Sequence, residues 1–218
     1  FADQTYQVQA DCEPANPGTG LSSPVSAKLF KRGNVNNDAS VDVLTSGDHI
    51  WKRKEIFELI RAEPRILRPV NYPAGAPGAG WGIFRSASGK EVGVINALGR
   101  VFLEPMDCPF RAVRKAVDEI SRRTKTIIVD LHAEATSEKI AMGWFLDGEV
   151  SAVLGTHTHV QTADERILPR GTAYISDVGM AGPFDSVLGR KVEAVVERFL
   201  SGLPVRFDVA EGNIQLHG

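Results

Sequence analysis

Short apolar runs alternate with amphipathic stretches along most of this chain, and this pattern predicts an α/β protein. Apolar residues at three- and four-residue intervals predict helices in Lys52–Ala62, in Ser137–Phe145, and in stripes running from Phe110 to Ile120 and from Val192 to Phe199. Short β-branched runs bounded by Gly, Pro or polar residues predict strands at Val41–Thr45, Val92–Ala97, Thr126–Leu131, Ala152–Gly155, Ala173–Ser176 and Val205–Val209. We therefore expect one α/β domain over residues 1–218, with a mixed sheet.

Residues 1–40 differ from the rest of the chain. They are rich in Pro and Gly, and only a short strand near Tyr6–Ala10 and a short helix near Val25–Lys31 fit their pattern. We interpret this part as a divergent or truncated N-terminal region. A second Pro/Gly-rich stretch, Arg68–Gly89, predicts a long loop, and loops of that length usually have a function.

The composition excludes several classes of protein. Of 218 residues, 43% are hydrophobic and 24% are charged, as in a globular protein. The formal net charge of −2 offers no overall attraction for DNA, RNA or an anionic membrane. No apolar stretch approaches the roughly 20 residues that span a bilayer, and the first residues lack the features of a signal peptide. We therefore expect a cytoplasmic protein that binds neither DNA nor membranes.

Four of the five histidines follow predicted strands. His49 follows the first predicted strand, His132 follows the third, and His157 and His159 follow the fourth. Residues i and i+2 of an extended segment point to the same side, so His157 and His159 can face one metal ion. Two exposed or core histidines are the alternative, but strand ends in open α/β sheets commonly carry ligand sites.

Carboxylates accompany these histidines. Asp48 precedes His49 on a turn, and either a ligand or an ordinary Asx turn fits its position. Asp130, two residues before His132, is either a partner of that histidine or a cap for a neighbour. We assign Glu134 and Glu138 to the start of the following helix. A His/carboxylate set without Cys favours manganese, iron or zinc at a hydrolytic centre.

Five stretches of the sequence resemble one known family. They are TSGDHIWKRKEIF, RPVNYPAGAPGAG, INALGRVFLEPMDCPF, DLHAEATSEKIAMGW and GTHTHVQTADERILPRGTAYISDVGMAGP, and they cover roughly residues 41–212. The order of Gly-Asp-His, a strand-end His and a final His-x-His resembles that of calcineurin-like metallophosphoesterases. More narrowly, the chain resembles the bacterial YmdB-like phosphodiesterases.

This resemblance implies a four-layer αββα sandwich with mixed sheets and two metal ions, iron or manganese first and zinc as a third option. It implies hydrolysis of small phosphodiesters, including cyclic nucleotides such as 2′,3′-cAMP, by a metal-activated water. In this reading Asp48, His132 and His157 bind one metal, His159 binds the other, and His49 is the catalytic histidine. The resemblance is also compatible with a homo-oligomer, and it identifies no substrate-binding residue.

The N-terminal part departs from the family pattern. Aligned by resemblance, Glu13 matches a carboxylate that bridges the two metals, whereas Pro14 replaces an Asn ligand and has no side-chain oxygen. The Asp of the family's opening Gly-Asp-x-x-Gly turn has no counterpart, and Asp48 replaces a family Asn. One metal therefore keeps a full ligand set, and the second keeps only Glu13 and His159. We expect that second position to be weak or vacant.

Two functions remain open. The first is a metal-dependent phosphodiesterase, which the retained histidines favour. The alternative is a degenerate, catalytically impaired homologue that binds metal or nucleotide or acts as a scaffold, which Pro14 and the missing Asp favour.

Overall fold

The computed structural model describes residues 42–218. The strand predicted near Tyr6–Ala10, the helix predicted near Val25–Lys31 and the predicted ligand Glu13 lie outside these residues. Over the described part the chain is an α/β protein, as the sequence predicts.

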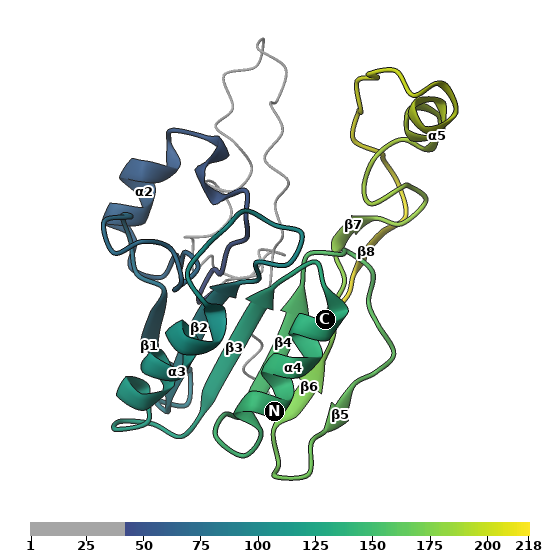
Figure 1. Cartoon of the computed structure of the whole chain (residues 1–218). Coiled ribbons are helices and arrows are strands. Elements are labelled where there is room, and N and C mark those ends of the chain that lie inside the picture. The colour runs from purple at the N-terminus through teal and green to yellow at the C-terminus, as the bar shows by residue number, and fades with distance from the viewer. Residues whose placement is uncertain (1–41) are drawn as a thin grey trace.

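A six-stranded mixed sheet organises the described residues (Figure 1). Its spatial order is β1-β2-β3-β4-β6-β5. The four inner strands β2, β3, β4 and β6 run parallel, and β1 and β5 pair antiparallel at the two edges. The strands are β1 (Trp81–Arg85), β2 (Glu91–Leu98), β3 (Ile127–His132), β4 (Ala152–Thr156), β5 (Arg166–Ile167) and β6 (Ala173–Ile175). The mixed sheet is therefore confirmed.

Two helices, α3 (Pro109–Ile120) and α4 (Thr136–Leu146), lie against one face of this sheet (Figure 1). The remaining helical elements are the 3₁₀ turn η1 (Ile50–Lys52), α2 (Ile56–Ala62) and α5 (Val192–Ser201). Figure 1 shows α5 away from the sheet, beyond a two-stranded ribbon of β7 (Ala181–Pro183) and β8 (Ile214–Leu216). None of the helices described here is long and apolar enough to cross a membrane.

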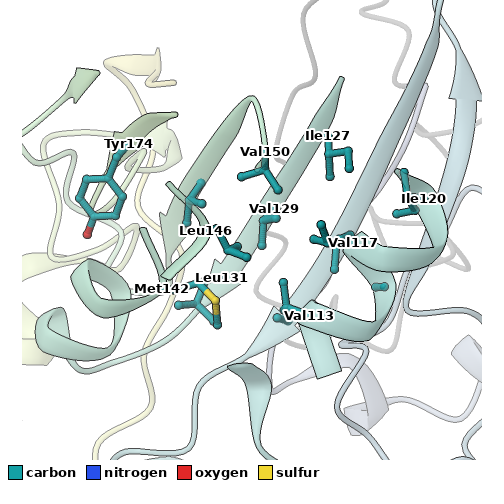
Figure 2. Packing of buried hydrophobic residues seen from close by; sticks show 14 of the residues in the cluster. Val113, Val117, Ile120, Ile127, Val129, Leu131, Met142, Leu146, Val150 and Tyr174 are labelled. Atoms are coloured by element: carbon teal, nitrogen blue, oxygen red, sulfur yellow. The ribbon is translucent and has the colours of Figure 1, made fainter. Parts of the chain in front are cut away.

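The largest core cluster lies between the sheet and the two helices α3 and α4 (Figure 2). The apolar stripe of α3 follows the predicted helical spacing, and Pro109 fits its first turn because the missing N–H has no partner there. Side chains of α3, α4, β3 and β6 meet in this cluster; those labelled in Figure 2 include Val113, Val117, Ile120, Val129, Leu131, Met142, Leu146 and Tyr174.

Two predicted strands are wrong. The described residues of Val41–Thr45 form only an isolated bridge, between Leu44 and Ile66, and Val205–Val209 forms only one, between Val209 and Arg190. A β-branched run becomes a strand only where a neighbouring strand offers free backbone groups. In the part of the chain that the structure describes, neither run pairs with β1 or β5, the two edge strands of the main sheet, so neither run extends its ladder.

The predicted loop Arg68–Gly89 contains a strand instead of being irregular throughout. Residues of β1 pair with β2 through a hairpin, and the backbone N–H of Ser86 donates to the Lys90 carbonyl oxygen in its turn. Two glycines conceal this strand in the sequence, because glycine normally weakens a strand. Gly80 is required for packing: a Cβ there would lie 2.3 Å from the Cα of Val70.

The core between sheet and helices predicts a contrast between two leucine variants. Leu146 of α4 is fully buried, whereas Leu200 of α5 is 84% exposed. We expect Leu146→Ala to lower the free energy of unfolding by about 2–5 kcal/mol, because it leaves a cavity. Leu200→Ala should change it by less than about 0.5 kcal/mol. Urea unfolding of both variants measures this, and equal losses would contradict the packing described here.

Candidate metal centre

The carboxyl ends of two neighbouring parallel strands position the centre of the site. His132 is the last residue of β3, and in the sheet register it lies beside Thr156, the last residue of β4. His157 follows Thr156 directly, so two imidazoles from distant parts of the chain meet at one edge of the sheet. Their ring centroids are 4.7 Å apart. The predicted convergence of strand-end histidines is confirmed for this pair.

A turn before η1 brings Asp48 to the same place. Asn96 of β2 fixes this turn, because its side-chain amide donates to the backbone oxygens of Ser46 (2.8 Å) and Leu67 (3.0 Å). Gly47 allows the turn to press against the histidine, since a Cβ at this position would lie 2.4 Å from the His132 ring. The glycine is therefore needed for contact between the turn and β3.

Three candidate ligand atoms converge. His132 Nε2 lies 3.1 Å from Asp48 Oδ1 and 2.9 Å from His157 Nδ1. One ligand atom from each of these residues falls within 4.8 Å of the other two. A divalent cation with bonds of about 2.0–2.2 Å to nitrogen and oxygen needs ligands at roughly this spacing. The residues present therefore fit a metal ion by both chemistry and geometry.

The protonation states of two of these residues also suit a metal. Burial lowers the pKa of His132, against the opposing effect of its hydrogen bond with Asp48, and so favours the neutral, ligating imidazole. Burial acts to raise the pKa of Asp48, but the hydrogen bond and charge of His132 outweigh it and lower the pKa to about 2. Asp48 is therefore ionised at neutral pH.

Thr156 and Asp130 support His132 from behind. The Thr156 hydroxyl donates to Asp130 Oδ1 (2.9 Å) and lies 3.2 Å from His132 Nδ1. Burial raises the pKa of Asp130 to about 6. The predicted partnership of Asp130 with His132 thus exists, but it runs through the Thr156 hydroxyl.

The backbone at His157 and His159 is strained. His157 has φ 108° and His159 has φ 67°, values that favour glycine. Such residues cost on the order of 1–3 kcal/mol each and cluster at functional sites, where surrounding contacts hold them. The sequence pattern predicts an extended segment at residues 157–159, and this prediction is therefore wrong.

The other predicted site residues lie in different positions. His49 Nδ1 is 3.2 Å from Asp48 Oδ2, and the His49 side chain is 44% exposed, so it adjoins the cluster without being one of its three members. His159 is not in the cluster either. Glu13 lies before the described residues.

The sequence prediction is wrong for Glu134, whereas Glu138 lies in the first turn of α4 as predicted. Glu134 Oε2 lies 3.0 Å from His157 Nε2, so this carboxylate belongs beside the site. Glu138 accepts hydrogen bonds from the backbone N–H groups of Arg100 and Val101. Neither caps α4, whose N-cap is Ala135 without a side-chain hydrogen bond. Glu134 lies two residues beyond the strand-end His132, and this position in the sequence could have indicated that its carboxylate lies beside the site.

Comparisons with known proteins agree with this geometry. A family model described as YmdB-like protein matches residues 4–218. The chain is 50% identical over 206 residues to the 2′,3′-cyclic-nucleotide 2′-phosphodiesterase of Bacillus subtilis (strain 168), covering 94% of this chain and 75% of that protein.

Two crystal structures are also similar. One is a hypothetical protein from Thermus thermophilus, with TM-score 0.74, 43% identity, and coverage of 80% of this chain and 68% of that one. The other is a novel phosphatase from Mycoplasma pneumoniae, with TM-score 0.72, 36% identity, and coverage of 81% and 64%.

The close approach of Gly47 to His132 predicts that a single methyl group disrupts the centre. We expect Gly47→Ala to push the His132 ring away from Asp48 and to weaken Mn²⁺ binding on the order of tenfold or more. Gly75→Ala is the matched control, because a Cβ at Gly75 meets nothing within 4 Å. Isothermal titration with Mn²⁺ measures both variants, and wild-type affinity in Gly47→Ala would refute the contact.

Proposed function

This chain belongs to the YmdB-like protein family, and from that premise we propose that it is a metal-dependent phosphodiesterase that hydrolyses 2′,3′-cyclic nucleotides. The observation that carries the proposal is the convergence of Asp48, His132 and His157 at one edge of the sheet. The named activity of the Bacillus subtilis relative supports the choice of substrate.

Asp48, His132 and His157 would hold a divalent cation. When bound, such an ion polarises a phosphoryl group and lowers the pKa of a water molecule. We favour iron or manganese over zinc on the grounds of family resemblance. A second cation would rest on Glu13 and His159 in the same resemblance, and we expect it to be held more weakly.

His49 is our candidate for the catalytic histidine. Asp48 Oδ2 lies against His49 Nδ1 and orients the ring, so that Nε2 is the nitrogen left to serve the substrate. Opening a 2′,3′-cyclic phosphate leaves a ribose oxygen that needs a proton, and a protonated imidazole can supply it. Asp48 would thereby assist two groups at once: His132 through Oδ1 and His49 through Oδ2.

We also propose that the sheet is one half of a four-layer αββα sandwich within a single domain. By the alternation along their strands, Val94, Ile128 and Leu154 point to the sheet face opposite α3 and α4, and these apolar residues suit a second layer. The expectation of a cytoplasmic enzyme that acts on a small substrate belongs to the same proposal.

Metal analysis coupled to an assay with 2′,3′-cAMP and added Mn²⁺ tests this function. We expect His49→Ala to lower kcat by at least about 10²-fold, the usual contribution of an acid–base group, while the metal content stays near that of the wild type. His132→Ala should lose the metal as well as the activity. Folding is checked by thermal unfolding of each metal-free protein.

Two outcomes would redirect the assignment. A wild-type protein that binds metal yet leaves 2′,3′-cAMP and bis-p-nitrophenyl phosphate intact would favour the degenerate homologue. Loss of metal in His49→Ala would place His49 among the ligands instead.

A further inference from the structure

A buried ion pair lies next to the strained segment that carries His157 and His159. Lys139 Nζ of α4 is 2.9 Å from Asp177 Oδ2, in the segment that follows β6. The side chains of Lys139 and Asp177 are 2% and 1% exposed. Pairs this deeply buried seldom stabilise a fold more than apolar residues of the same size would, so their presence calls for another explanation.

Asp177 contacts the residue between the two strained histidines. Its Oδ2 accepts hydrogen bonds from the backbone N–H of Thr158 (2.9 Å) and from the Thr158 hydroxyl (2.8 Å). Its Oδ1 accepts from the backbone N–H of Gly179 (2.9 Å). With Lys139, the carboxylate therefore receives four donors, three of them on one oxygen.

The neighbouring backbone is shaped to permit this contact. A Cβ at Gly155 would lie 1.8 Å from the carbonyl oxygen of Ser176, so the ends of β4 and β6 approach more closely than any larger residue allows. The same Cβ would lie 3.0 Å from Lys139 Cδ. This close approach brings Asp177 and Lys139 within reach of the turn after β4.

We propose that Lys139 and Asp177 are positioning residues that hold Thr158, and through it the left-handed conformations of His157 and His159, in the arrangement that ligates the metal. A residue with positive φ persists only where surrounding contacts fix it, and here one carboxylate accepts from both hydrogen-bond donors of Thr158, its backbone N–H and its hydroxyl. Lys139 neutralises that carboxylate and ties it to α4. The proposal rests on the metal role proposed for His157.

Thr158 offers the most local test. Thr158→Val keeps the shape but removes the hydroxyl that donates to Asp177, whereas Thr158→Ser keeps the hydroxyl. We expect Thr158→Val to weaken Mn²⁺ binding about 10-fold or more, the range seen for groups that support metal ligands, and Thr158→Ser to restore most of the affinity.

Asp177→Asn tests the carboxylate itself. Both oxygens of Asp177 accept hydrogen bonds, but the Asn side chain has one oxygen and one NH₂ group. In one orientation the NH₂ faces the Gly179 N–H, and in the other it faces the donors of Thr158 and Lys139, so one of these sets of hydrogen bonds is lost in either orientation. We expect Mn²⁺ affinity to fall about 10–100-fold. The matched control is Asp147→Asn: Asp147 is equally buried, and it accepts from the backbone N–H groups of Arg170 and Thr172 at the opposite end of the sheet. Its Mn²⁺ affinity should stay within about twofold of wild type, even if its Tm falls.

A second measurement is independent of metal and of activity. Backbone ¹³C chemical shifts of His157 and His159 in the metal-free protein report their φ angles, and they should move in Thr158→Val and Asp177→Asn but not in Asp147→Asn. Unchanged shifts in the first two variants, or equal losses of affinity in Asp177→Asn and Asp147→Asn, would overturn the proposal. Absence of phosphodiesterase activity with the expected shifts would instead count against the proposed function alone.

Discussion

The parallel pairing of β3 with β4 is the interaction on which the rest of the site depends. Its register places His132 beside Thr156, and this fixes the distance between His132 and His157, which are 25 positions apart in the chain. A shift of one residue would turn His132 to the other face of the sheet. The core under α3 and α4 opposes such a shift, because Val129 and Leu131 would leave it at the same time.

The residues of the site surround this strand pairing at increasing distance from His132. Asp48 and His157 contact His132 directly, Thr156 supports it from the neighbouring strand, and Asp177 supports the turn beyond. These residues come from separate segments of the chain, so no local stretch of sequence contains the site. The ionised carboxylate of Asp48 adds a negative charge to this edge of the sheet, and that charge strengthens the attraction for a cation.

The sequence predicted the parts of this arrangement that follow from periodicity and sheet geometry. Long apolar stripes placed α3 and α4, and the rule that parallel strands end at a common edge brought His132 and His157 together. The errors have physical causes. Glycines concealed β1, whose side-chain pattern is interrupted at Gly82, and Glu134 resembled a helix-start residue because Thr136 begins α4. The positive φ angles at His157 and His159 depend on tertiary hydrogen bonds that Thr158 donates to the distant carboxylate of Asp177, and no local pattern encodes them.

The shortness of β5 has a consequence for how this protein behaves at high concentration. An unpaired strand at the side of a sheet can template the addition of another chain, which is a route to aggregation. Among residues 42–218, the outermost strand at this side is only Arg166–Ile167, and it begins with a cationic residue. A second chain would find too few unpaired backbone groups there to form a stable ladder, so this margin of the sheet resists strand-by-strand growth.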